Sequence, residues 1–240
     1  MLGIHRTSVL TSHKTDMKKL TLGTAATISM LTSAHSAVIV GTNSIAFTGT
    51  ATEETVFSLN LESQIVDGSG LSATPTAANV GSVTHANVAN GNAWATIDPT
   101  PAGGDYFAET VGTVVFEIVL DNTYAITDFV HWSYGFGTIN DNNISNVTFD
   151  YGVGDYASST GAVALAEAST AGGSVITSIG SITADRIRIT VNDNYFVPQG
   201  DGGDRVGIAE VRFIGDVVPE PSSVALLGLG GLALIFRRRK

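Results

Sequence analysis

Cysteine is absent from all 240 residues of the sequence. Its absence excludes a disulfide scaffold, a thiolate zinc site and a cysteine nucleophile. Two atypical ends leave roughly 180 residues between them, the usual size of one domain. A domain of that length can bury a sizeable core without a disulfide or a metal to hold it together.

Lysine is missing from residues 38–218, and arginine is scarce there. This segment holds 20 acidic residues against four arginines, a net charge near −16. The four are Arg186, Arg188, Arg205 and Arg212. Such a surface repels phosphate, so the sequence predicts no nucleic-acid partner. It suits an extracellular domain and supplies carboxylates for calcium.

Catalytic motifs are also lacking. The sequence has no Gly-x-Ser-x-Gly elbow, no phosphate-binding loop and no His-x-x-x-His pair. His85 and His131 lie far apart, and His131 stands beside Trp132 on a predicted strand, where a structural role is expected. We therefore predict that the protein is not an enzyme.

The N-terminal residues have the pattern of a secretory signal peptide. Met17-Lys18-Lys19 forms a basic start, Leu20 to Leu31 is apolar, and small residues follow up to Ala37. Residues 1–37 are thus predicted to be a signal peptide with an extended basic region, cut by signal peptidase after Ser36 or Ala37. Met1 and Met17 both remain possible starts, and a buried N-terminal helix is the alternative reading.

The C-terminal residues combine a motif, an apolar segment and a basic end. Pro219-Glu220-Pro221 precedes the uncharged stretch Ser222 to Phe236, and Arg237, Arg238, Arg239 and Lys240 close the chain. These 15 uncharged residues extend about 22 Å as a helix, short of the roughly 20 residues that span a bilayer comfortably. Snorkelling arginines can cover the deficit and hold the end in the cytoplasm. A buried terminal helix would leave four terminal cations unexplained.

Residues 217–240 resemble the PEP-CTERM sorting signal, with motif, helix and arginine cluster in the right order. The resemblance implies export and transient anchoring in the inner membrane. It also implies cleavage near the motif by an exosortase, which releases or re-attaches the product at the cell surface. The family is associated with bacteria that make extracellular polysaccharide and biofilm matrix.

Residues 38–216 are typical of an all-β domain. Short apolar and β-branched runs recur between Gly, Asn, Asp and Thr clusters, which predicts an antiparallel β-sandwich of jelly-roll type. The predicted strands are Val38–Ile45, Glu54–Leu61, Thr113–Leu120, Ile126–Trp132, Asn146–Tyr151, Ser174–Ile179, Arg186–Val191 and Gly207–Ile214. Only Ala162–Ala171, in the predicted loop 152–173, could form a helix.

Within this domain, four segments resemble discoidin-like domains of the coagulation factor 5/8 C-terminal type. They are Val66 to Ser72 with His85 and Trp94, Val115 to Leu120, Ile126 to Tyr134, and Val206 to Phe213. The sequence departs from that family where Asn122 follows Asp121 and Ser133 follows Trp132. The resemblance implies a galactose-binding-like sandwich and carbohydrate binding.

The same resemblance implies a structural calcium ion. Its ligands would be Asp67 with carbonyl oxygens around Gly68–Ser72, and Glu210 with the carbonyl of Ala209. Calcium takes six to eight oxygen ligands from such groups. The alternative is that Asp67 caps a turn and Glu210 lies at the sandwich edge. Asp201 and Asp204, in a Gly-Asp-Gly-Gly-Asp loop, form a weaker second candidate.

A sugar site needs an exposed aromatic ring beside a few fixed polar groups. Tyr195, flanked by Asn192, Asp193 and Asn194, is the first candidate, and Trp94 and Tyr134 follow. Tyr106, Phe136 and Phe196 are further loop aromatics, whereas Trp132 and Phe129 are expected in the core. Simple packing is the alternative for each of them.

These patterns predict an exported, non-catalytic surface or matrix protein that binds exopolysaccharide or envelope glycan. A structural coat protein without a specific ligand is the rival prediction, and an accessory module of a hydrolase is a third.

Overall fold

The computed structural model describes residues 37–54, 61–88, 91–98, 104–109, 111–135, 138, 141–197 and 204–219. All of them belong to one structural unit, His35–Lys240. The predicted signal peptide up to Ser36 and the tail from Glu220 onward lie outside the described residues. Over the described ranges, no helix is long and apolar enough to cross a membrane.

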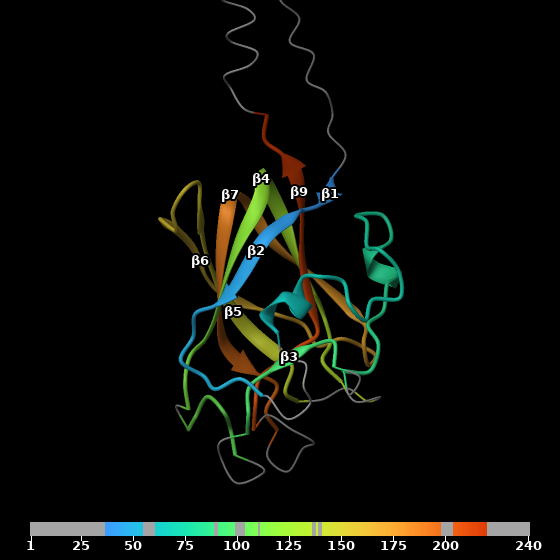
Figure 1. Cartoon of the computed structure of the whole chain (residues 1–240), viewed down its shortest axis with the longest axis vertical. Helices are drawn as coiled ribbons and strands as arrows, with labels where there is room; N and C mark the ends of the chain where they lie inside the picture. Colours follow the sequence, from blue (N-terminus) through green and yellow to red (C-terminus); the bar gives the residue numbers. More distant parts are fainter. Residues whose placement is uncertain are drawn as a thin grey trace, which may run out of the picture. The chain divides into compact units, whose positions relative to one another are not determined.

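The domain is an antiparallel β-sandwich, as the sequence predicted, with no α-helix in its described part. Its strands are β1 (Val38–Ile39), β2 (Thr42–Phe47), β3 (Trp94–Ala95), β4 (Val114–Trp132), β5 (Ile144–Gly152), β6 (Ser158–Ala164), β7 (Ser174–Asn194), β8 (Gly207–Ile208) and β9 (Glu210–Val217). Two 3₁₀ turns, η1 (Glu62–Ile65) and η2 (Val80–Ser82), complete the order. The main sheet runs β1-β9-β4-β7-β5-β6, β2 also pairs with β4, and β3 pairs with β8 (Figure 1).

Two long strands, β4 and β7, organise this sheet. β4 has 19 residues and β7 has 21, and each unites two strands that the sequence predicted as separate. Their pairing shifts register between Val119 and Tyr124, which bends both strands without a turn. The first half of β4 pairs with β2 and the second half pairs with β9. A single long strand therefore contributes to the pairing of two different neighbours in the sandwich.

Side-chain alternation along β4 places the main core. Val114, Phe116, Ile118 and Leu120 are buried, while the residues between them are only half-buried. This period of two is that of a strand with one face on the core. Aromatic rings from β4, β5 and β9 meet there, and Phe129 lies 4.9 Å from Phe149 and 5.5 Å from Phe213, ring centre to ring centre.

A second buried cluster covers the opposite face of β4. Val130 and Trp132 pack there against Val80, Val83 and other residues of the segment that carries η2. The indole Nε1 of Trp132 donates to the Val83 carbonyl at 2.8 Å. The expectation that Trp132 and Phe129 belong to the core is therefore confirmed, and the segment 72–88 is anchored to the sheet.

The segment 152–173 differs from its prediction as a long loop with a possible helix. Ser158–Ala164 forms β6 and pairs with β5, and the rest of Ala162–Ala171 is irregular. Small, mostly exposed residues gave no apolar alternation to reveal this edge strand. The interior of the predicted strand Glu54–Leu61 lies outside the described residues.

Candidate functional site

The Asp67 loop, residues 66–72, is a tight turn that follows η1. Oδ1 of Asp67 accepts the Ser69 amide at 2.6 Å, and the Leu71 amide donates to the Gly68 carbonyl at 3.2 Å. Gly68 and Gly70 have φ angles of +82° and +87°, which side-chain-bearing residues rarely adopt. Asp67 thus caps the turn, as one reading of the sequence proposed.

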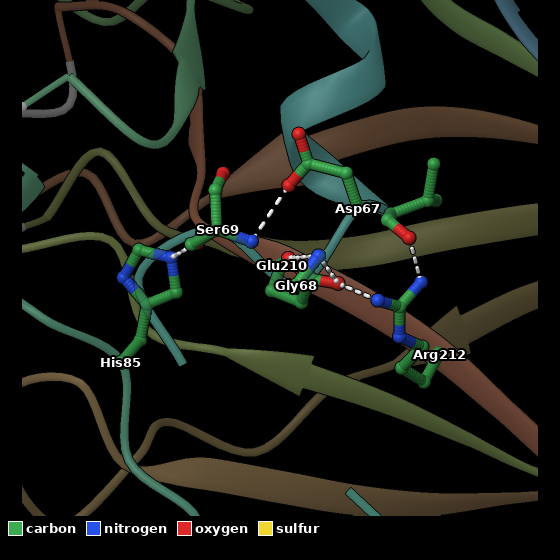
Figure 2. Close-up of polar contacts among 7 residues, drawn as sticks. Asp67, Gly68, Ser69, His85, Glu210 and Arg212 are labelled. Carbon is green, nitrogen blue, oxygen red and sulfur yellow. Dashed lines mark hydrogen bonds and ion pairs between the residues drawn. The ribbon is translucent and has the colours of Figure 1, made fainter. Parts of the chain in front are cut away.

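Glu210 is the first residue of β9 and lies where the chain leaves β8. Its side chain is fully buried, at 0% exposure. The Gly68 amide donates to both of its carboxylate oxygens at 3.2 Å, across 142 positions of sequence. The carboxylate therefore holds the Asp67 loop against the last strand (Figure 2).

Arg212 follows two residues later, so its side chain leaves β9 on the same face as that of Glu210. Its Nη2 lies 2.6 Å from Oε1 of Glu210, and its Nη1 donates to the Val66 carbonyl. Only 11% of the Arg212 side chain is exposed. The guanidinium thus bridges the carboxylate of the strand and a carbonyl of the loop, as Figure 2 shows.

Burial acts on the ionisation of both partners. It raises the pKa of Glu210 to about 8, while Arg212 and the Gly68 amide oppose the increase. Burial likewise lowers the pKa of Arg212, against the attraction of Glu210 and Asp67. Both carboxylate oxygens of Glu210 accept hydrogen bonds from N–H donors, the Gly68 amide and the Arg212 guanidinium. A protonated carboxyl would carry a hydrogen of its own on one oxygen and would lose one of these bonds. The geometry therefore favours the ion pair.

His85 closes the other side of the loop. Its ring nitrogens lie 2.8 Å from the Ala86 carbonyl and 3.1 Å from the Ser69 carbonyl. A neutral imidazole can donate to one of these oxygens and an imidazolium to both. Burial lowers the pKa of His85, opposed by these carbonyls and by Asp67. A Cβ on Gly70 would lie 2.7 Å from the ring, so glycine there lets the imidazole pack against the loop.

The structure brings Asp67 and Glu210 into one site, but their oxygens are a poor donor set for calcium. The carbonyls of the loop already accept protein donors: Arg212 on Val66, Leu71 on Gly68, and Ala86 on Gly70. Calcium takes six to eight oxygen ligands, so it would compete with these donors. A guanidinium beside the carboxylate also opposes a divalent cation. The residues present therefore do not fit the predicted ion.

A pocket of about 380 Å³ opens beside this site. Its lining residues include the charged Asp67 and Arg212, the apolar Leu71, Ala73 and Pro75, and the hydroxyl-bearing Thr74. Sequence reasoning did not identify this pocket. The spacing of Glu210 and Arg212 on one strand face was the available signal, because a strand places residues i and i+2 together.

The second calcium candidate is only partly described. Asp201 lies outside the described residues, and Asp204 lies 3.8 Å from the guanidinium of Arg205. Burial raises the pKa of Asp204, and the neighbouring Asp98 adds to the increase. Within the described ranges, no three His, Asp or Glu side chains are grouped to hold a metal.

The aromatic residues proposed for sugar binding do not present the exposed ring that a sugar site requires. Trp94 is 0% exposed and Tyr134 only 5%, so the expectation that they present open faces is wrong. Trp94 packs edge-on against Phe116 with ring centres 4.8 Å apart, and its Nε1 donates to Glu53 at 2.7 Å. Tyr195 is half-buried and its hydroxyl donates to the Leu165 carbonyl.

Three solved structures illustrate what the chain is similar to. A fucolectin from striped bass (Morone saxatilis) serum has 12% sequence identity and a TM-score of 0.41, covering 71% of this chain and 46% of that one. The chain thus spans less than half of the fucolectin. A fucose binding module of Streptococcus pneumoniae has 11% identity and a TM-score of 0.43, covering 72% and 94%. An F5/8 type C domain from Bacteroides fragilis has 12% identity and a TM-score of 0.44, covering 76% and 98%.

In sequence, no curated protein matches the chain. One family model does match: residues 217–240 carry the PEP-CTERM protein-sorting motif. The prediction from Pro219-Glu220-Pro221 and the basic end is therefore confirmed. The motif indicates an exported protein that is sorted to the cell surface.

Proposed function

We propose that this protein is processed by an exosortase at its C-terminal tail and that its β-sandwich binds carbohydrate at the cell surface without cleaving it. Export is supported by the sorting motif at residues 217–240. Strand β9 ends at Val217, and the exposed Pro219 follows two residues later. An enzyme that cuts near this motif, on the outer side of the inner membrane, would therefore act close to the end of the last strand.

The pocket beside the Asp67 loop is the observation that carries carbohydrate binding. Its size falls in the lower part of the range of small-molecule sites, about 300–1,000 Å³. Asp67 can accept hydrogen bonds from hydroxyl groups, and the guanidinium of Arg212 can donate to them. Leu71 and Pro75 supply apolar wall for the C–H faces of a sugar ring.

The charge of the site favours a neutral sugar. Asp67 and Glu210 are two acids against the single cation Arg212. A uronic acid or sulfated sugar would meet the acidic excess of the whole domain, near −16 over residues 38–218. The proposed ligand is thus a neutral, hydroxyl-rich glycan of the envelope or matrix.

Binding without catalysis fits the environment of the two carboxyl groups. Glu210 is buried and held by the amide of Gly68 and by Arg212. Asp67 uses Oδ1 to cap its own turn. Neither is poised as the free acid or base of a glycosidase pair, which needs two carboxyl groups facing one bond.

A glycan and polysaccharide binding screen with the purified full-length chain in detergent tests the proposal. We expect saturable binding to a neutral sugar class. The variant Ala73→Trp, which places a large ring at the pocket wall, should abolish that binding. Ala157→Trp, at an exposed turn outside the pocket, is the matched control and should bind normally.

A rival function is a structural coat protein with no specific ligand. Absence of saturable binding across the panel would favour it. Binding that survives Ala73→Trp would contradict the pocket as the site. Release of reducing ends from a polysaccharide would contradict the non-catalytic assignment.

A further inference from the structure

We propose that the guanidinium of Arg212 is the internal cation that ties the Asp67 loop to strand β9, in the place where the resemblance to discoidin-like domains implies calcium, and that this tie makes the domain independent of calcium. The inference concerns how the site is held together. It does not rest on the proposed carbohydrate binding.

The first argument is the position of the guanidinium. Arg212 reaches Glu210 on its own strand and the carbonyl of Val66, which lies 146 positions earlier. A cation that contacts a carboxylate of the last strand and a carbonyl of the first loop joins the two segments that the predicted calcium would join. Arginine is suited to this because its planar fork offers several donors in fixed directions.

The second argument is the balance of charge. One buried carboxylate, Glu210, faces one largely buried guanidinium, and the nearby Asp67 leaves these three groups with one net negative charge. Adding a divalent ion would turn that charge positive beside a guanidinium that is largely buried. Like charges a few ångströms apart repel strongly in such surroundings.

The third argument is that several of the oxygens already accept hydrogen bonds. The carboxylate of Glu210 accepts the Gly68 amide and Arg212, and Oδ1 of Asp67 accepts the Ser69 amide. Carbonyls of the loop accept Arg212, the Leu71 amide and the Ala86 amide, and the His85 ring covers that of Ser69. Calcium would have to displace several of these bonds at once.

This arrangement has a consequence outside the cell. A loop held by calcium loosens when the free ion becomes scarce, because the stabilisation by a bound ion depends on its concentration. A loop held by an arginine of the same chain does not. The pocket beside the loop would therefore keep its shape whatever the calcium level of its surroundings.

The test is thermal unfolding of the purified full-length chain in calcium, in chelator and in magnesium at equal ionic strength. We expect the same Tm for the unmodified protein in all three. Magnesium controls for the general screening of an acidic surface by divalent ions. A Tm that rises in calcium relative to magnesium, or falls in chelator, would overturn the proposal.

The companion variant is Arg212→Gln. Its Tm should fall on the order of 10 °C, because the carboxylate of Glu210 is left buried without its cation. Calcium should restore part of that loss, since the cation position is now open. Arg186→Gln, which removes an arginine that is about one-third exposed and paired with Asp185 at 2.9 Å, should leave Tm nearly unchanged. An unchanged Tm in Arg212→Gln would overturn the bridging role.

If that variant does not fold, calorimetric titration of the unmodified protein with calcium still tests the proposal. Absence of a calcium-specific heat supports it, and specific binding overturns it.

Discussion

The Nη2 atom of Arg212 lies 2.6 Å from Oε1 of Glu210, in an ion pair that the last strand presents to the Asp67 loop. Glu210 is fully buried, whereas both side chains of the pair that joins β4 and β7, Glu117 with Arg188 at 2.8 Å, are about one-third exposed. Burial determines how much such a pair contributes to stability, because removing one partner leaves the charge of the other buried and without solvation.

Replacement of Glu210 by Ala should lower the free energy of unfolding by about 3–5 kcal/mol, because it leaves Arg212 uncompensated and the Gly68 amide without its acceptor. Chemical denaturation measures the loss. The control Glu117→Ala removes a solvent-screened partner of Arg188 and should cost less than about 1 kcal/mol. Equal losses in the two variants would contradict the special weight given to the buried pair.

Gly70→Ala should destabilise the Asp67 loop for two reasons. The backbone φ of +87° costs an L-residue about 1–2 kcal/mol, and the new Cβ would lie 2.7 Å from the His85 ring. Gly180→Ala separates the two effects, since its φ is +77° but nothing lies within 4 Å of the added carbon. We expect Gly70→Ala to lose clearly more stability than Gly180→Ala in denaturant unfolding. An equal or smaller loss would mean that the loop rearranges to accommodate the added carbon at little cost.

The buried imidazole of His131 should make the domain sensitive to acid. Burial lowers its pKa to about 4 from an ordinary value of 6.5, so the unfolded chain binds this proton more readily than the folded one. Stability must therefore fall as the pH drops from about 6.5 to 4, by up to about 3 kcal/mol.

The variant His131→Leu isolates this contribution. Its unfolding free energy, subtracted from that of the unmodified protein at each pH, should show the loss between pH 6.5 and 4 and a flat difference above pH 7. The buried Nδ1 of His131 has no hydrogen-bond partner, so an apolar replacement costs little there. Parallel curves over the whole range would refute the assignment.

Tryptophan fluorescence should report the core and not the ligand. Trp94 and Trp132 are the two tryptophans of the chain, and both are buried. Emission should therefore be blue-shifted in the folded protein and stay unchanged when a glycan saturates the pocket. Trp94→Phe should lower stability by about 1–3 kcal/mol through the lost Glu53 hydrogen bond and the smaller ring, with binding retained. A spectral shift on glycan addition, or lost binding in a folded Trp94→Phe protein, would restore Trp94 as a ligand contact.

Several features of the fold could be predicted because their signals are local. The alternation along 114–120 and the sandwich class follow from a period of two in apolar residues. The union of two predicted strands in β4, and likewise in β7, could not be read in this way. A bulge at 119–124 keeps both halves in one sheet, whereas the polar residues there look like a turn in sequence.

By itself the sequence determined that residues 217–240 carry the sorting motif, and the acidity and all-β character of the domain that precedes it. These properties belong to short segments or to composition, so no distant contact is needed to establish them. Tertiary structure alone decided that Trp94 is core and that Arg212 meets both Glu210 and the carbonyl of Val66. Those outcomes depend on strand register and loop placement across more than 140 residues. At that separation, tertiary packing and not the local sequence pattern determines which groups come into contact.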